Sequence, residues 1–448
     1  MDSPHRSNGA ITMIGKQHPK VVLIQLPSPW LMRDRDTPLL GVLYLATNLQ
    51  HEGIEVQVCD LVGVEEENWN IPEGDIYGIS LTTPQVPETR KVIKYLRERT
   101  KKPVTIIVGG PHPSAMPQWC VDKLGADYAF KGEADVALVD FVKNGPPKVG
   151  NVIRCIPPIV SKLPIIRRDF VDMRSFHRIG INQYILWQDM KGGFQYEGYL
   201  QTGRGCPFDC AFCAQDTITN RSVRFYTVEQ VLADLDNLLN YWECDLVYMQ
   251  DDTFNIKKSR VLELCKAFEE RKFKWHCLCR ADLLDKEQCD AMAAAGCQNI
   301  TFGFESGSQK ILDLMGKGES VEEGARGAEL THEAGMGVRG QMVVGFPGED
   351  DDTIKETIDF IARVKAEKLG FHAFVPLPGS RSWDDAAQFG IEIDHNEDFA
   401  TGFHTIGQPR EWKRIVHNEA KTREWLKILY EAAGEHNIWM KHTPEKCL

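Results

Sequence analysis

The sequence lacks the features that mark membrane and secreted proteins. No stretch of its 448 residues approaches the roughly 20 consecutive apolar residues that a transmembrane helix needs. The first residues, Met1–Lys20, are polar and contain no apolar core of the kind found in a secretory signal peptide. We therefore expect a cytoplasmic protein with no membrane partner, in which residues 1–19 form a flexible tail.

Positive charge is also in short supply. Lys and Arg together number 52 against 64 Asp and Glu, which gives a net charge of −12. Because no basic patch dominates, nucleic acid is not expected as a partner. A small cationic substrate would suit an acidic protein, although most of this charge is expected to be solvated surface.

The composition is otherwise that of an ordinary globular protein, with 42% hydrophobic and 26% charged residues. The length favours two or three domains, each with a core of its own. Thirteen cysteines are spread along the chain. In a long cytosolic chain this number favours reduced thiols and a metal cluster over disulfide bonds.

Strand and helix patterns alternate along two parts of the chain, which predicts an α/β protein. In residues 20–145, short aliphatic runs alternate with amphipathic segments and indicate a doubly wound parallel sheet; the expected strands are Val21–Leu26, Ile54–Cys59, Ile76–Leu81 and Val104–Val108, and the expected helices are Leu39–Glu52 and Glu88–Thr100. Its ligand crevice should lie at the carboxyl ends of the strands, where Thr82–Gln85 and Gly110–Ser114 follow.

Residues 146–195 are expected to be a linker, because repeated prolines interrupt any regular element between Gly145 and Pro164. Alternation resumes over residues 196–390, with a first strand near Tyr199–Gln201 and further strands at Leu246–Met249, Lys274–Cys279, Asn299–Phe302, Gly340–Val344 and Gly370–Phe374. Six such units predict a partial (β/α)6 barrel. Residues 391–448 are expected to form a helical extension.

Three closely spaced cysteines carry the strongest chemical signal. Cys206, Cys210 and Cys213 form a C-x3-C-x2-C run directly after the first strand of the second domain. Thiolates at this spacing can hold three irons of a [4Fe–4S] cluster and leave the fourth iron open. Zinc is disfavoured, because it normally takes four protein ligands, or three with a histidine among them, and no histidine lies nearby.

This run, with Phe212 before its last cysteine, resembles the signature of radical S-adenosylmethionine (SAM) enzymes. The resemblance implies that SAM chelates the open iron and is cleaved by one electron to a 5′-deoxyadenosyl radical. A reducing partner of the flavodoxin or ferredoxin type is implied as well.

Further positions match loops of the same family after successive strands. Asp252 resembles the residue that binds the methionyl amino group of SAM, although it could instead cap the following helix. Arg280 resembles an arginine that faces the SAM carboxylate or a substrate oxygen; a surface salt bridge is the alternative. Glu305 and Ser306 belong to a G-x-E-S-G segment, and Gly345 and Pro347 to a G-x-P-G-E turn associated with the adenine.

The first domain resembles the cobalamin-binding domains fused to radical SAM proteins. The resemblance rests on Thr37–Ala46, Gly109–Pro113 and Asp127–Glu133. The D-x-H-x-x-G element that supplies a cobalt ligand in that family is absent. Some relatives bind cobalamin without it and others bind none, so cobalamin remains an open alternative.

Two reactions are compatible with this domain pairing. The shortness of the segment after the barrel and the acidic charge favour a dehydratase (a lyase) of antibiotic biosynthesis, which would abstract hydrogen from an aminosugar or aminoglycoside-like diol. The alternative is a cobalamin-dependent C-methyltransferase of a natural-product pathway. Cys277 and Cys279, finally, could ligate an auxiliary cluster but are expected to be core thiols.

Overall fold

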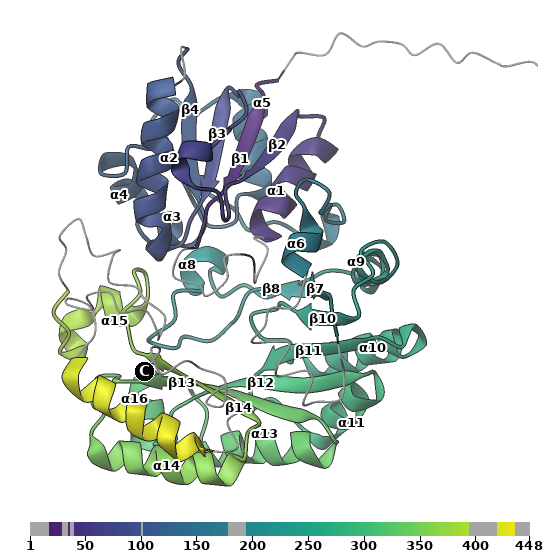
Figure 1. The fold of residues 1–448 in the computed structure, drawn as a ribbon, viewed down its shortest axis with the longest axis vertical. Coiled ribbons are helices and arrows are strands. Elements are labelled where there is room, and N and C mark those ends of the chain that lie inside the picture. Colours follow the sequence, from purple (N-terminus) through teal and green to yellow (C-terminus); the bar gives the residue numbers. More distant parts are fainter. Residues whose placement is uncertain are drawn as a thin grey trace, which may run out of the picture.

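The computed structural model describes residues 18–28, 35, 40–99, 102–177, 194–393 and 419–434. Within these residues the strands form two six-stranded parallel sheets and one two-stranded antiparallel ribbon. The expected α/β architecture, a doubly wound sheet followed by a partial six-stranded barrel, is confirmed. Figure 1 shows the first sheet stacked above the second, with the helix α8 (Asp216–Thr219) between them.

The first sheet has the strand order β2-β1-β3-β4-β5-β6. Its strands are β1 (Val21–Gln25), β2 (Val56–Asp60), β3 (Ile76–Ser80), β4 (Thr105–Gly109), β5 (Tyr128–Lys131) and β6 (Val152–Arg154), and its larger helices are α1 (Leu40–His51), α2 (Val86–Arg99) and α5 (Asp135–Asn144). Shorter helices are α3 (Pro111–Ala115), α4 (Pro117–Asp122) and α6 (Met173–His177).

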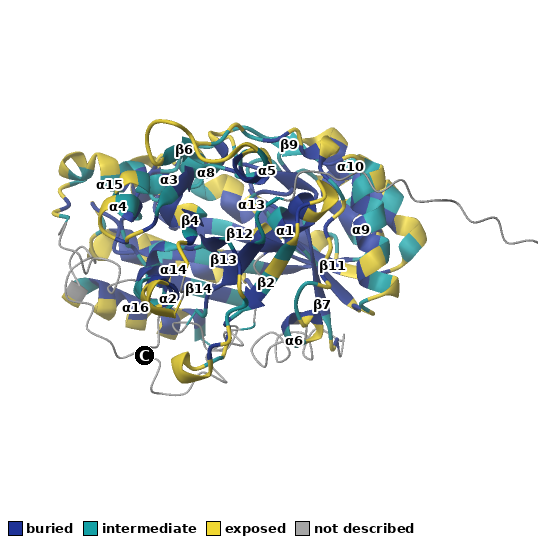
Figure 2. Cartoon of the chain, turned by 90° about the horizontal axis from the view of Figure 1, so that it is seen from above, coloured by how far each residue is buried: buried dark blue, intermediate teal, exposed yellow. Residues whose placement is uncertain are grey.

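Strand β1 shows why this sheet is buried on both faces. Val22 and Ile24 pack into the core that α2 covers, whereas Val21 and Leu23 pack into the core under α1 and α5. Since successive side chains point to opposite faces, a run of aliphatic residues fits this position and no alternating pattern is needed. Figure 2 colours buried residues dark blue and exposed residues yellow, and the yellow residues gather on the outer sides of the helices.

One expectation for the linker was wrong. Val152–Arg154 forms β6 and pairs in parallel with β5 at the edge of the first sheet. A strand of three residues between two proline-rich stretches carries too few residues for a periodic signal, and an edge position tolerates the flanking prolines. Most of the expected tail (residues 1–17 of 1–19), Thr37–Leu39, residues 178–193, and most of the C-terminal extension lie outside the described residues.

The second sheet has the order β14-β13-β12-β11-β10-β7, with every neighbouring pair parallel. Its strands are β7 (Glu197–Leu200), β10 (Leu246–Met249), β11 (Lys274–Cys279), β12 (Cys297–Glu305), β13 (Gly337–Val344) and β14 (Lys368–Ala373). The ribbon consists of β8 (Gly203–Arg204) and β9 (Arg224–Phe225).

Helices cover one face of the second sheet. They are α9 (Val228–Asn240), α10 (Lys258–Phe268), α11 (Lys286–Ala294), α12 (Gln309–Met315), α13 (Val321–Glu333) and α14 (Asp351–Val364), followed by α15 (Arg381–Asp384) and α16 (Glu419–Ala433). Capping boxes begin α9, α11, α13 and α14, each with a Thr, Asp or Ser side chain bonded to a backbone amide three residues on. None of the helices described is long and apolar enough to span a membrane.

A buried ion pair joins the segment after the first sheet to the second domain. Arg168 binds both carboxylate oxygens of Asp234 on α9 and donates to the carbonyl of Tyr199 at 2.8 Å. Its neighbour Arg167 is exposed and pairs with the exposed Asp169.

We expect Asp234→Ala to lower the free energy of unfolding by about 3–5 kcal/mol, because it leaves the Arg168 guanidinium buried without its counter-charge. The matched change at the exposed neighbour pair, Asp169→Ala, should cost less than about 1 kcal/mol. Denaturant titration of both variants measures the difference; equal losses would show that burial of the first pair does not matter.

Candidate functional site

The three cysteines lie in the loop between β8 and α8, and the backbone of this loop is held at several points. Gly205 begins it with a φ of +95°, and a Cβ there would come within 2.1 Å of the Ser222 carbonyl oxygen. The Ala211 amide donates to the Met315 carbonyl at 2.7 Å. Ala211 also packs in a small apolar cluster with Phe346, so the loop is fixed in place by packing as well as by hydrogen bonds.

The cysteine side chains lie close enough to influence one another. Although part of Cys213 is exposed to solvent, desolvation of its thiol by the surrounding protein raises its pKa to about 12, and the nearby Cys210 and Cys206 raise it further. Burial likewise raises the pKa of Cys210, while Lys317 and Arg280 oppose the rise. Positive groups beside a thiol favour the thiolate, which is the form that binds iron.

No group of three or more His, Cys, Asp or Glu side chains in the described residues could hold a single metal ion. A [4Fe–4S] cluster has a different requirement, because each thiolate binds a different iron and the ligands are spread around the cube. Three soft thiols on one ordered loop fit this cluster, and they leave one iron without a protein ligand.

Asp252 connects the end of β10 to the cysteine loop. Its carboxylate accepts from the Gly205 amide at 2.9 Å and from Gln215 Nε2 at 2.8 Å. Burial raises the pKa of Asp252, and these two hydrogen bonds oppose the rise. Asp252 does not cap α10, whose N-terminal residue is preceded by Lys257.

Arg280 is 4% exposed and is not part of a surface salt bridge. Its guanidinium binds both oxygens of Asp282, at 2.9 and 3.0 Å, and donates to the Lys317 carbonyl at 2.9 Å. It also stacks over the ring of Phe208, 3.7 Å from the ring centroid, within the cysteine loop. Arg280 therefore lies beside the cluster site.

Glu305 ends β12 in a left-handed conformation, with a φ of +62°. Such a conformation is costly for a residue other than glycine and is concentrated at functional sites. Its carboxylate accepts from Lys317 Nζ at 3.3 Å, and a Cβ on Gly303 would come within 2.2 Å of it. Ser306 points elsewhere: its hydroxyl contacts Thr357 on α14 and accepts from the Ser308 amide.

Gly345 and Pro347 form a turn after β13, close to the cysteine loop. Gly345 has a φ of +88°, and a Cβ there would meet Thr422 Oγ1 of α16 at 2.4 Å. The Gly345 amide donates to Glu349, and burial raises the pKa of that carboxyl to about 7. Pro347 is buried. Phe346 lies between them and packs in the same apolar cluster as Ala211. This cluster therefore connects the turn to the cysteine loop.

Two residues of this site were not predicted. Lys317, between two glycines after α12, is buried and lies 3.3 Å from Glu305 and 3.9 Å from Glu319. Arg204, the residue before Gly205, is 9% exposed and lies at the contact between the two domains. Neither belongs to a periodic pattern, although an Arg adjoining the C-x3-C-x2-C run could have been singled out.

Arg204 joins the two domains through charge and ring contacts. Its guanidinium binds Asp135 at 3.0 and 3.3 Å and Glu133 at 3.1 Å, both from the first domain. It lies over the ring of Tyr44 on α1, at 4.6 Å, and donates to the Tyr226 hydroxyl at 2.9 Å. The first sheet is thus attached directly to the residue that begins the cysteine loop.

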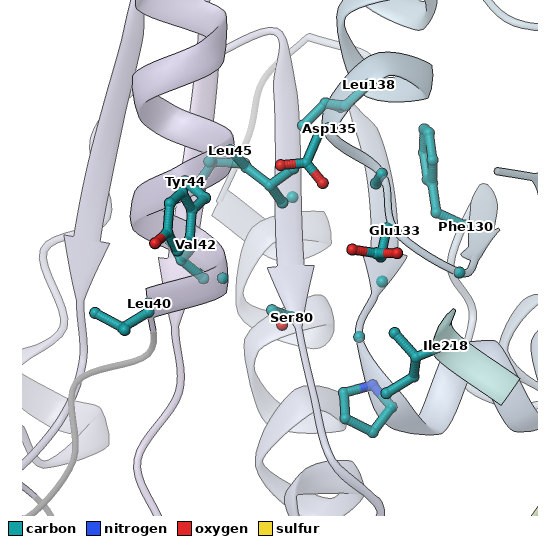
Figure 3. A pocket seen from close by; sticks show the side chains of 18 of the residues that line it. Leu40, Val42, Tyr44, Leu45, Ser80, Phe130, Glu133, Asp135, Leu138 and Ile218 are labelled. Carbon is teal, nitrogen blue, oxygen red and sulfur yellow. The ribbon is translucent and has the colours of Figure 1, made fainter. Parts of the chain in front are cut away.

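A cavity of about 530 Å³ lies between the domains (Figure 3). Figure 3 shows Tyr44, Glu133, Asp135 and Ile218 around it. The first domain contributes α1, the ends of β3 and β4, and the loop before α5; the second contributes Arg204, Gln215, Gln250 and Asp252 among others. The Asp252 carboxylate therefore borders both the cavity and the cysteine loop.

The lining of this cavity fits a large ligand. Glycines 41, 78, 109, 110 and 132 belong to it, and Gly41 has no atom within 4 Å of the position of a Cβ. Gly110 and Pro111 line the cavity as expected, but Thr82–Gln85 does not. Gln85 turns back to the carbonyl of Pro27 instead.

The residues that line this cavity include no histidine, cysteine or methionine. His112 follows Pro111, a residue of the cavity lining, and could have been a cobalt ligand. It is instead fully buried beside Thr83 and Trp119, and burial lowers its pKa to about 4. The glycine-rich and largely apolar lining suits cobalamin, and a cobalt ion there would receive no imidazole or sulfur ligand from the described lining.

Cys277 and Cys279 are core thiols. Both are buried under the helices of the second sheet, with their sulfur atoms 3.6 Å apart. Burial raises the pKa of Cys277 well above its usual value.

Comparison with known proteins agrees with this geometry. Residues 200–361 match the Radical SAM superfamily, and residues 33–142 match the B12 binding domain. An uncharacterized methyltransferase of Pyrococcus horikoshii is 26% identical over 80% of each chain. Cytidylyl-2-hydroxyethylphosphonate methyltransferase of Streptomyces wedmorensis is 24% identical over 85% of this chain and 84% of its own length.

Solved structures share the fold. The radical SAM methyltransferase TsrM of Kitasatospora setae, with cobalamin and a [4Fe–4S] cluster bound, superposes with a TM-score of 0.66 at 19% identity, over 82% of this chain and 75% of its own. The cobalamin-dependent radical SAM enzyme OxsB superposes with a TM-score of 0.62 at 20% identity, over 85% of this chain and 56% of its own.

The expectation of a dehydratase was wrong. Several relatives carry the names of methyltransferases, including a bacteriochlorophyllide methyltransferase of Chlorobaculum tepidum. Neither net charge nor the length of the last segment, the two features that favoured dehydration, reports on the reaction. The matched segments are thus a Radical SAM domain and an N-terminal B12 binding domain, and these two domains support the expected [4Fe–4S] cluster, SAM and cobalamin as cofactors.

Proposed function

We propose that the protein is a cobalamin-dependent radical SAM methyltransferase that methylates a small molecule. The observation that carries the proposal is a cavity bordered by both the B12 binding domain and Asp252, whose carboxylate is itself hydrogen-bonded to the cysteine loop. A ligand in that cavity and a cluster on that loop would lie on either side of one carboxylate. The names of the relatives support the same reaction.

When bound, the cluster and SAM supply one-electron chemistry and a methyl group, and cobalamin supplies a methyl carrier. The chain's own residues bind and orient these groups. Cys206, Cys210 and Cys213 hold the cluster, and their positions are set by the Ala211 amide and by Gly205.

We assign the residues that contact SAM by matching the charge of each side chain to a group of SAM. Asp252 and Glu305 are carboxylates beside the cysteine loop and suit the ammonium and hydroxyl groups of SAM, whereas Arg280 suits its carboxylate. The turn that contains Gly345 and Pro347 offers backbone atoms to the adenine. We assign Ser306 a structural role, because its hydroxyl is bonded to its own loop and to α14.

The contact between the domains excludes water. Arg204 and its partners are buried at the edge of the cavity, and a reactive radical is preserved only where few other molecules can reach it. The electron would come from a small flavodoxin-like or ferredoxin-like partner.

Methyl transfer can be tested before the substrate is known. The full chain, reconstituted anaerobically, is incubated with reductant and SAM whose methyl group is trideuterated. We expect S-adenosylhomocysteine to form only when cobalamin has been loaded. Its formation at the same rate without cobalamin, or deoxyadenosine as the sole product in both cases, would contradict the proposal. With candidate acceptors, the product should carry a trideuterated methyl group in place of one hydrogen.

Replacement of all three loop cysteines by alanine should abolish the cluster, because no other described thiol lies on the loop. We expect iron to fall from about four per chain to near zero. The control is Cys277→Ala with Cys279→Ala, which should keep the iron. Retention of about four irons in the triple variant would remove these cysteines from the site.

Glu305→Gln and Asp252→Asn should each weaken SAM binding by about tenfold, since a charge-assisted contact is worth on the order of 1–3 kcal/mol. The exposed Glu329→Gln on α13 is the matched control and should bind SAM normally. Affinity is measured by equilibrium dialysis on protein with a full complement of iron. Unchanged affinity in both site variants would show that neither carboxylate contacts SAM.

A further inference from the structure

Residues 148–162, here called the edge segment, expose several large aliphatic side chains. The segment contains β6 and lies at the edge of the first sheet. Val149 and Ile156 are 89% and 81% exposed, more than any other large hydrophobic residue that the structure describes, and Ile159 is 61% exposed. Figure 2 shows exposed residues in yellow beside β6, on the side of the molecule where β9 and α8 lie. Exposed aliphatic side chains gathered on one short segment are typical of a surface that contacts another molecule.

The edge segment is also basic, in a protein that is acidic overall. No Asp or Glu occurs in residues 141–168, although the chain has 64 such residues. Lys148, Arg154 and Lys162 are exposed, and they form no hydrogen bond or ion pair with any residue that the structure describes. Positive charge without a partner, beside exposed aliphatic side chains, favours a partner whose surface is negative and partly apolar.

The edge segment contacts the ribbon from which the cysteine loop begins. The carbonyl of Pro158 accepts a hydrogen bond from Arg224 on β9 at 3.3 Å. β9 pairs with β8, and Gly205, the first residue of the cysteine loop, directly follows β8. One pair of short strands therefore separates the edge segment from the start of the loop.

The same segment lies close to the helix in which the cysteine loop ends. Gly132 is situated between the two, since the position of a Cβ on it is 3.6 Å from the Cβ of Cys155 and 3.4 Å from the carbonyl oxygen of Ile218 on α8. Only two residues separate Cys213 from α8. The edge segment is thus one layer of chain away from each end of the loop that carries the cysteines.

We propose that the edge segment is the docking site of the protein's electron donor, a small acidic electron-carrier protein. This inference rests on the proposed function, which needs an electron from outside, and adds the place where the electron is delivered. One electron leaves the docked donor, which is oxidised, and reduces the cluster by one electron; no atom or proton is transferred.

The size and charge of the surface fit this partner. Contacts between electron-transfer proteins are small and transient, so a short segment with a few aliphatic side chains is sufficient. A second copy of this chain fits less well. A two-fold contact places the same patch of both copies face to face, which would bring Lys148, Arg154 and Lys162 against their own equivalents.

The test compares reductants that must dock with one that need not. The full chain is reconstituted anaerobically with iron and sulfide, and reduction of its cluster is followed by stopped-flow absorbance. Reduced flavodoxin and reduced ferredoxin, both acidic proteins, are the docking donors, and dithionite is the small reductant. We expect Lys148→Glu combined with Arg154→Glu to lower the second-order rate with a protein donor by about tenfold or more, and to leave the rate with dithionite unchanged.

Two further measurements separate charge from apolar contact. In the unchanged protein, the rate with the protein donor should fall as salt is added, because salt screens attraction between exposed charges. Ile156→Ser should lower that rate without changing its dependence on salt. The matched control is Lys266→Glu combined with Lys355→Glu, two exposed residues of α10 and α14, which changes the net charge equally and should keep all rates. Iron content and thermal melting establish that each variant is folded.

The inference is overturned if the edge-segment variants are reduced by the protein donors as fast as the unchanged protein, or if the control is slowed equally. Reduction by dithionite alone, with neither protein donor active, would overturn it as well. Binding to vesicles that contain phosphatidylserine, lost in the double variant while the donor rates stay the same, would make the segment a membrane contact instead. Formation of S-adenosylhomocysteine with dithionite as reductant is measured separately, so failure of the docking site and failure of the methyltransferase proposal are distinguishable.

Discussion

The arrangement of the whole molecule depends on the buried guanidinium of Arg204. Two carboxylates from the first domain and two tyrosine rings, one from each domain, surround it. Arg204 is also the residue before Gly205, so the group that attaches the B12 binding domain is covalently adjacent to the cysteine loop. A buried arginine deprived of its carboxylates costs several kcal/mol, which makes the contact between the domains intolerant of partial separation. The cavity and the cluster site are therefore held in one fixed relation.

Most of the fold could be predicted, because buried strands of parallel sheets are recognisable in the sequence as short aliphatic runs. β10 and β11 coincide with their expected ranges, and the remaining expected strands differ from the structure by a few residues at their ends. β5 and β6 were not predicted, because strands of four and three residues are too short to show a periodic pattern. The cysteine loop was equally visible, because its information is local: three residues of one type lie within eight positions.

The rest of the site could not be predicted, because its contacts join distant positions. Arg204 meets Glu133 across 71 residues, and no property of either residue in the sequence points to the other. Lys317 acquires its role only when α12 brings it beside Glu305.

The ordered cysteine loop also bears on how the enzyme is assembled in the cell. The Gly205 and Ala211 amides donate hydrogen bonds to Asp252 and to the Met315 carbonyl, and these bonds together with the packing of Ala211 hold the loop. Cys213 is exposed, while Cys206 and Cys210 are half-buried. A chain with such a loop can finish folding first and receive its cluster afterwards from a carrier protein at the exposed thiol. Maturation then becomes a delivery step on a finished scaffold, and apoprotein purified under air should accept iron and sulfide without being unfolded.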